Sequence, residues 1–164
     1  MISKSQIAAE MTRDCDITKH VFTKCPGDAF DYRPTPKQRS TTELLRYLAI
    51  CGIAGIRSLD ESNWKLFREM EAEMATMKPE DFPAAMDKQK AAIMKFFDSV
   101  SEKTLETKDA ALPAGGTIKL GEGILGLPFK WIPAYRLQLL LYAKACGCAN
   151  IGTANAWMGM DWPA

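Results

Sequence analysis

The sequence predicts an all-α protein, a four-helix bundle with one additional short helix and an irregular C-terminal tail. Residues 129–147 carry the clearest signal, because apolar side chains recur there at steps of three and four residues, which places them on one side of an α-helix. The periodic positions are Ile132, Tyr135, Leu139, Tyr142 and Cys146. Two further observations are an amphipathic segment over residues 4–24 and a capping-box pattern at residues 40–43. Each of these marks another helix of the bundle.

The first helix is expected over residues 4–24. Its apolar positions fall within a narrow arc of the helical wheel, and Pro26 and Gly27 end it. His20, the only histidine, points away from this arc, so we expect it on the solvated surface. Residues 28–39 hold two prolines, which restrict the residues before them to extended conformations. This segment is therefore expected to be a crossing loop, pinned to the bundle by Phe30 and Tyr32.

The second helix is expected over residues 40–59. Ser40 can accept a hydrogen bond from the amide of Glu43 while the Glu43 side chain reaches back, which is the reciprocal arrangement of a capping box. After Arg46 the sequence is apolar all round and contains several small residues, two of them glycines. Each glycine in a helix interior costs roughly 1 kcal/mol relative to alanine, so tight packing must offset it. We therefore expect this helix to be the most buried element.

Two more helices are expected before the glycine-rich region. A short one over residues 64–77, capped by Asn63, carries Leu, Phe and Met side chains on one face and acidic side chains on the other. A longer one runs from Pro83 to about residue 105, since a proline early in a helix has no hydrogen bond to lose. Its buried side includes Gln89, a polar group that needs a partner or a pocket.

Residues 108–128 are rich in glycine, and part of this region is expected to form an irregular start to the last helix, because structureless loops of about 20 residues are rare in compact domains. Within the last helix, Lys130, Arg136 and Lys144 are expected to face solvent. The tail over residues 147–164 carries Trp157 and Trp162, too much apolar area to leave in water. The tail should therefore pack on the bundle or on a second copy, and we expect a homodimer.

Composition places the chain among ordinary globular proteins, with 47% hydrophobic and 25% charged residues, and its 164 residues suit a single domain over residues 1–164. No apolar run approaches the roughly 20 residues of a membrane span, so no membrane association is expected. The 21 basic and 20 acidic residues are interspersed, which argues against nucleic acid as a partner. The N-terminus resembles neither a signal peptide nor a transit peptide, which predicts a cytoplasmic location.

The cysteines are expected to be reduced residues that behave mainly as small core hydrophobes. They form no C-x-x-C pair and have no histidine nearby, which excludes the common zinc patterns. Cys25 and Cys148, each near an expected helix end, are the best candidates for a reactive thiol. The full set is Cys15, Cys25, Cys51, Cys146 and Cys148.

The helix pattern, together with the short segments at residues 42–48 (Thr-Glu-Leu-Leu-Arg-Tyr-Leu), 120–125 (Leu-Gly-Glu-Gly-Ile-Leu) and 135–138 (Tyr-Arg-Leu-Gln), resembles the DinB/YfiT-like superfamily. The resemblance spans nearly the whole chain and implies a four-helix bundle. In that superfamily one histidine of the second helix and two of the last helix bind nickel or zinc, which supports transfer or isomerisation with low-molecular-weight thiols. The corresponding positions here are Tyr47, Trp131 and Tyr135.

These three residues cannot replace histidine as metal ligands, because an indole nitrogen only donates and a phenol ionises only near pH 10. We therefore expect no metal and no cofactor. Tyr47, Trp131 and Tyr135, with Gln89, form the candidate site, which is either a pocket for a small-molecule ligand or a filled core. Small-molecule binding is the leading interpretation. The alternatives are a metal-free transferase-like enzyme using Tyr47 or Tyr135 as an acid or hydrogen-bond donor, and a non-catalytic structural dimer.

Overall fold

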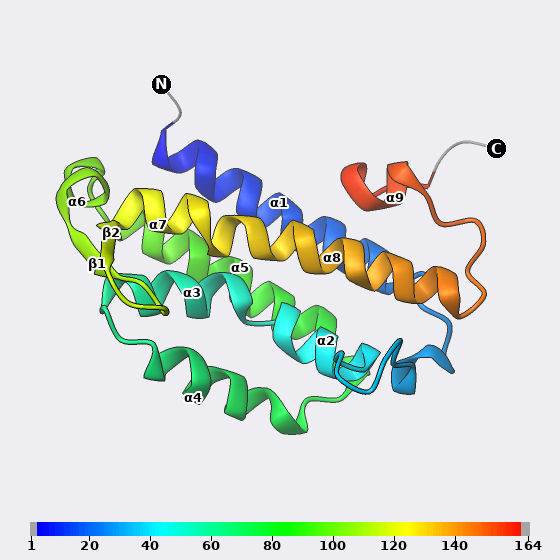
Figure 1. Cartoon of the computed structure of the whole chain (residues 1–164). Helices are drawn as coiled ribbons and strands as arrows, with labels where there is room; N and C mark the ends of the chain where they lie inside the picture. Colours follow the sequence, from blue (N-terminus) through cyan, green and yellow to red (C-terminus); the bar gives the residue numbers. More distant parts are fainter. Residues whose placement is uncertain (1–2, 162–164) are drawn as a thin grey trace.

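The computed structural model describes residues 3–161 and shows an all-α bundle, as the sequence predicts (Figure 1). Its long axis is followed by α1, α5, α8 and the consecutive pair α2 and α3, with α1 packed on α5 and α8, and α3 on α8 and α5. The helices are α1 (Lys4–Phe22), α2 (Thr41–Leu48), α3 (Cys51–Asp60), α4 (Lys65–Glu73), α5 (Phe82–Ser99), α6 (Glu102–Thr107), α7 (Leu120–Gly126), α8 (Pro128–Ala145) and α9 (Thr153–Met158). Short 3-10 turns lie at η1 (Ala29–Asp31), η2 (Met74–Thr76) and η3 (Pro79–Asp81).

The expectation of one helix over residues 40–59 is wrong, because the segment is broken between α2 and α3. The capping box at its start is present, with Ser40 and Glu43 exchanging both hydrogen bonds. The break lies at Ala49 and Ile50, where Ile50 leaves helical geometry with φ −132°. All of α3 except Arg57 and Asp60 is buried, in keeping with its apolar sequence.

The long helix expected over residues 83–105 is also two helices. α5 ends at Ser99, Val100 adopts an extended conformation, and the Ser101 side chain accepts a hydrogen bond from the amide of Thr104 to start α6. A serine that can cap a new helix competes with continuation of the old one. The short helix α4 ends one turn before residue 77, and the chain continues through η2.

The glycine-rich region contains a β-hairpin that the sequence did not predict. β1 (Asp109–Ala111) pairs antiparallel with β2 (Thr117–Lys119), and Ala110 lies opposite Ile118. Gly115 and Gly116 have φ of +94° and +86°, which a glycine pair in a hairpin loop adopts without strain. The hairpin leads into α7, a separate helix rather than an irregular start to α8.

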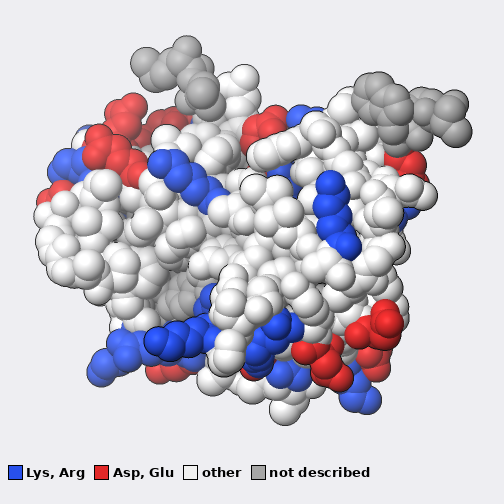
Figure 2. Space-filling view, turned by 45° about the vertical axis from the view of Figure 1, so that its right-hand side comes forward, with Lys and Arg blue, Asp and Glu red and all other residues white. Residues whose placement is uncertain are grey.

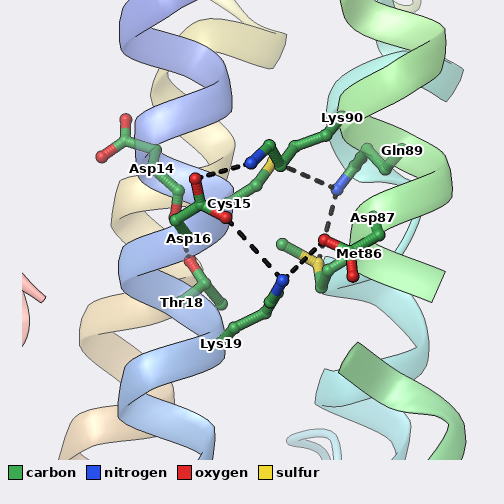
Figure 3. Close-up of polar contacts among 9 residues, drawn as sticks. All are labelled: Asp14, Cys15, Asp16, Thr18, Lys19, Met86, Asp87, Gln89 and Lys90. Carbon is green, nitrogen blue, oxygen red and sulfur yellow. Dashed lines mark hydrogen bonds and ion pairs between the residues drawn. The ribbon is translucent and has the colours of Figure 1, made fainter. Parts of the chain in front are cut away.

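The interface between α1 and α5 carries a polar border (Figure 3). Lys19 of α1 pairs with Asp87 of α5, and Lys90 of α5 pairs with Asp16 of α1, each at 2.6 Å. As the residue number rises in α1 it falls in α5, so the two helices are antiparallel. Exposed pairs of this kind contribute at most about 1 kcal/mol each, so they favour this register while the apolar residues beneath them provide most of the stability.

Arg136 is buried, and the expectation that it faces solvent is wrong. Its side chain is only 2% exposed and donates to the carboxylate of Asp14 on α1. The Trp157 ring of α9 lies over the guanidinium, 5.5 Å from Cζ to the ring centroid. Helical periodicity could not reveal an acidic partner 122 residues away in the sequence.

The C-terminal tail packs on its own bundle through α9, which contacts α1 and α8. Its polar anchor involves His20, whose Nε2 lies 3.0 Å from the Asn155 amide nitrogen. Asn155 also donates to Asp161, which pairs with Lys24 at 2.7 Å. His20 is therefore partly covered by the tail rather than freely solvated. Trp162 lies outside the described residues.

Two cysteines, Cys15 and Cys51, are buried, while the other three are partly buried. Burial raises the pKa of the Cys25 thiol to about 12, with Cys148 and Cys146 adding to the shift, so Cys25 is less reactive than an ordinary cysteine. Burial likewise raises the pKa of Cys15 to about 12. Within residues 3–161, each helix is too short or too polar to cross a membrane.

Candidate functional site

Two of the candidate residues, Tyr47 on α2 and Tyr135 on α8, lie against each other. Their ring centroids are 4.6 Å apart and the rings are inclined at 60°. Tyr47 is 8% exposed, whereas Tyr135 is half-buried. The pair therefore lies at the contact between α2 and α8, with one ring in the core and the other near its border.

Trp131 joins this pair through α4. The Phe67 ring of α4 contacts both Tyr47 and Trp131, with its centroid 5.8 Å from the Tyr47 centroid and 5.7 Å from the Trp131 centroid. Trp64, just before α4, lies 6.3 Å from Trp131 and donates its indole hydrogen to the carbonyl of Ala111 at 2.8 Å. We call the five rings the ring cluster. Its members are Tyr47, Trp64, Phe67, Trp131 and Tyr135.

Gly55 on α3 allows Trp131 to enter the cluster. A Cβ atom at this position would lie 2.8 Å from Trp131 Cζ3 and 2.9 Å from Pro128 Cβ, closer than packed carbon atoms approach. The glycine thus permits the close approach of α3 and α8 that the small residues of this segment suggested.

A cation completes the ring cluster. The guanidinium carbon of Arg39, in the loop before α2, lies 4.0 Å from the Tyr47 centroid and 5.8 Å from the Tyr135 centroid. Arg39 also contacts Glu71 of α4 at 3.5 Å. Sequence reasoning placed Phe67 on an apolar face but not at the site, and it missed Arg39, because a loop residue has no periodicity that could assign it to a partner.

Gln89, the fourth candidate residue, is used elsewhere. Its side-chain nitrogen donates to the carbonyl of Leu48 at 2.9 Å, and its oxygen accepts from the amide of Gly52 at 2.8 Å. One amide therefore satisfies the last carbonyl of α2 and an early amide of α3. Gly52 makes this possible, since a Cβ there would meet Ile132 at 2.8 Å and the Gln89 oxygen at 3.1 Å. Gln89 bridges the helix break instead of meeting a tyrosine hydroxyl.

A groove of about 840 Å³ lies between α3, α4 and α5. Of the four candidate residues, Gln89 alone lines it. Charged side chains of both signs, among them Arg57, Glu73 and Lys88, also contribute to its lining. Its main apolar side chains are Ile50, Ile53, Met70, Met74, Ala92 and Phe96. Because Phe67 and Met70 belong to the same helix, α4 connects the ring cluster to the groove.

The arrangement of the bundle matches a solved structure. No protein-family model and no curated protein matches the sequence. The crystal structure of the DinB-like protein YjoA from Bacillus subtilis superimposes with a TM-score of 0.68, covering 87% of this chain and 92% of that chain at 15% sequence identity. The fold is DinB-like. At this identity the similarity concerns the fold, so the chemistry must be judged from the residues of this chain.

The ring cluster does not fit the divalent metal expected of a DinB-like bundle. Burial raises the pKa of the Tyr47 phenol well above its ordinary value, with Cys51 and Tyr135 nearby adding to the shift, so Tyr47 stays neutral. The indole nitrogen of Trp131 carries a hydrogen and so lacks the free lone pair that a metal-binding nitrogen needs. Among residues 3–161, His, Cys, Asp and Glu side chains form no group of three or more that could hold a metal ion. The Arg39 guanidinium also already places a positive charge against two of the rings.

Proposed function

We propose that the protein binds a small, predominantly apolar molecule, without a metal, in the groove between α3, α4 and α5. The size and lining of this groove carry the proposal. Its volume of about 840 Å³ falls in the range of ligand sites, which are mostly apolar with a few polar groups that fix orientation. The space beside Tyr47, Trp131 and Tyr135, which the sequence offered as the pocket, holds Phe67 and Arg39, and the Phe67 contacts anchor α4.

The walls of the groove differ in how firmly they are held. α3 is almost entirely buried, whereas α4 has no buried residue. This wall contributes Met70 of α4 and Met74 of the following turn η2, whose flexible thioether side chains adapt to irregular ligand shapes. A ligand could therefore be accommodated by side-chain adjustment along α4 while α3 and α5 stay in place.

Filling the groove tests the proposal. Ala92 lines the groove, and its neighbour Ala91 on α5 is exposed to solvent outside it. We expect Ala92→Phe to weaken binding of the apolar fluorescent probe 8-anilinonaphthalene-1-sulfonate at least about tenfold, because the ring occupies the ligand space, and Ala91→Phe to leave it unchanged. Equal affinity of the two variants, measured by fluorescence titration on folded protein, would refute the assignment of the groove.

The alternative of a metal-free enzyme has less support. A phenol whose pKa is raised is a weaker acid than free tyrosine and remains protonated at neutral pH, so Tyr47 could donate a hydrogen bond but would be a poor proton donor or base. Ring contacts also surround Tyr47 on several sides. The structural-dimer alternative is favoured by a different observation, the exposed apolar side chains of α8 and α9, and is tested separately below.

A further inference from the structure

We propose a second binding site, for the phosphate or similar oxyanion group of a small molecule, where the loop before α2 meets α8. A polar hollow of about 470 Å³ lies there. It is lined by Arg33, Lys37, Gln38, Arg39, Glu43 and Gln138. This site is separate from the groove between α3, α4 and α5, so the two proposals stand or fall independently.

The charge of the hollow favours an anion. Three of the lining side chains are cationic and one is a carboxylate, Glu43, which pairs with Arg33 at 2.8 Å. The hydrogen bonds from Arg33 and the Ser40 amide hold the pKa of Glu43 below its ordinary value, so it stays charged in this pair. Lys37 makes no ion pair with any residue from 3 to 161. Arg39 is shared with Glu71 of α4 at 3.5 Å, so Lys37 supplies the positive charge that a ligand could use and Arg39 adds an oriented guanidinium.

Arg39 is held in place before any ligand arrives. Its guanidinium lies over the Tyr47 ring, and its carbonyl accepts a hydrogen bond from the Tyr142 hydroxyl at 3.0 Å. The bond to the Tyr142 hydroxyl ties the loop to α8, and the same hydroxyl accepts from the Gln138 side-chain amide at 2.5 Å within that helix. An oriented guanidinium loses less freedom on binding, and its planar fork matches the oxygens of phosphate.

Side-chain contacts within the loop before α2 hold its two ends together. The Arg33 guanidinium donates to the carbonyl of Gln38 across five residues, in addition to its pair with Glu43. Figure 2, in which the right-hand end of the bundle is turned forward, shows Lys and Arg side chains at the lower left and lower middle of a face whose centre is mostly uncharged, with Asp and Glu side chains at its lower right. The hollow thus combines a preformed backbone, an oriented guanidinium and an exposed lysine, and these groups suit recognition of an oxyanion.

Titration with inorganic phosphate and with phenyl phosphate, at constant ionic strength and followed by amide and side-chain NMR shifts, tests the site. We expect saturable shifts at Arg39 and Gln138 that are weakened about tenfold by Lys37→Ala, the loss expected for one charge-assisted hydrogen bond. Lys103→Ala, at an exposed lysine of α6 at the other end of the bundle, is the matched control and should bind as the unmodified protein does.

The outcomes separate the possible ligands. Tighter binding of phenyl phosphate would support a phosphate ester with an apolar group that reaches the neighbouring rings, and equal binding would support the free anion. Shifts that do not saturate, or the same affinity in Lys37→Ala and Lys103→Ala, would mean that the probe senses only ionic strength and would overturn the proposal. Because Lys37 is exposed, its replacement leaves the fold intact.

Discussion

Arg136 of α8 donates to the carboxylate of Asp14 of α1 at 2.5 Å, and Arg136 is almost completely buried. A second, longer contact of 3.4 Å joins the same guanidinium to the Asp14 backbone carbonyl. The Trp157 ring of α9 lies over the Arg136 guanidinium. The single ion pair therefore joins the first and last long helices of the bundle at a point that the C-terminal tail shields from water.

We expect Asp14→Asn to lower the free energy of unfolding by about 3–5 kcal/mol, because it leaves a buried guanidinium without its counter-charge. Glu10→Gln is the control, since Glu10 pairs with Arg13 on the exposed side of the same helix at 3.8 Å and should change stability by less than about 1 kcal/mol. Chemical denaturation measures both. Similar small losses in the two variants would show that the buried pair is not important for stability.

The second prediction concerns the bridge at the helix break. Gln89→Met keeps the size of the side chain but leaves the buried Gly52 amide without its acceptor and the Leu48 carbonyl with only the weak Cys51 thiol donor, which should cost about 2–5 kcal/mol. Lys88→Met, at the exposed neighbouring position, should cost less than about 0.5 kcal/mol. Hydrogen exchange gives a second readout, since the Gly52 amide should exchange faster in Gln89→Met. Unchanged protection of that amide would contradict the bridging role.

The third prediction is that the purified, tag-free protein holds no stoichiometric nickel or zinc, because two tyrosines and a tryptophan, which are poor ligands for these metals, stand where the family resemblance implies histidines. Elemental analysis measures the content, and dialysis against a chelator should leave the melting temperature unchanged. One metal ion per chain that is lost on Tyr135→Phe would show that the ring cluster binds metal after all.

The fourth prediction is a homodimer formed through α8 and α9. Large apolar side chains are exposed on these helices, with Leu141 55% and Trp157 53% exposed, and Leu137, Met158 and, just after α9, Met160 are similarly exposed. Exposed apolar area of this kind is typical of an interface. Sedimentation velocity at tens of micromolar should show a dimer that Leu141→Lys dissociates. Met94→Lys, at an exposed methionine of α5, should not. A monomer for the unmodified chain would remove this idea.

Local sequence signals predicted where the main helices lie but not where two of them break. The capping box at Ser40 and the apolar periodicity of α1 and α8 are present in the structure, and the DinB-like fold follows from their order. The spacing of Trp131 and Tyr135 placed both rings on one face of a helix. In the structure Tyr135 contacts Tyr47 directly, and Trp131 is linked to Tyr47 through Phe67. These features depend on residues close together in the chain or on a helix register.

The remaining features depend on partners that are distant in sequence. The helix break at Ile50 is stabilised by Gln89, so the residues near position 50 carry no local signal that predicts the break. From the sequence alone a charged residue such as Arg136 is expected on the surface, and only the structure shows that Asp14 lies beside it. Arg39 lies in a loop, where no periodic pattern assigns a neighbour, and strands as short as β1 and β2 carry too few residues to show an alternation.

The bridge at the helix break also affects how the chain can fold. The Gln89 oxygen and the Gly52 amide are 37 residues apart, so the segment joining α2 to α3 stays incompletely hydrogen-bonded until α5 has docked. A contact between residues this far apart in the sequence carries an entropic cost of loop closure, whereas the contacts within each helix are local and carry little such cost. The docking of α5 should therefore be a late cooperative step, in which α2 and α3 acquire their final relative orientation at the moment the central core closes.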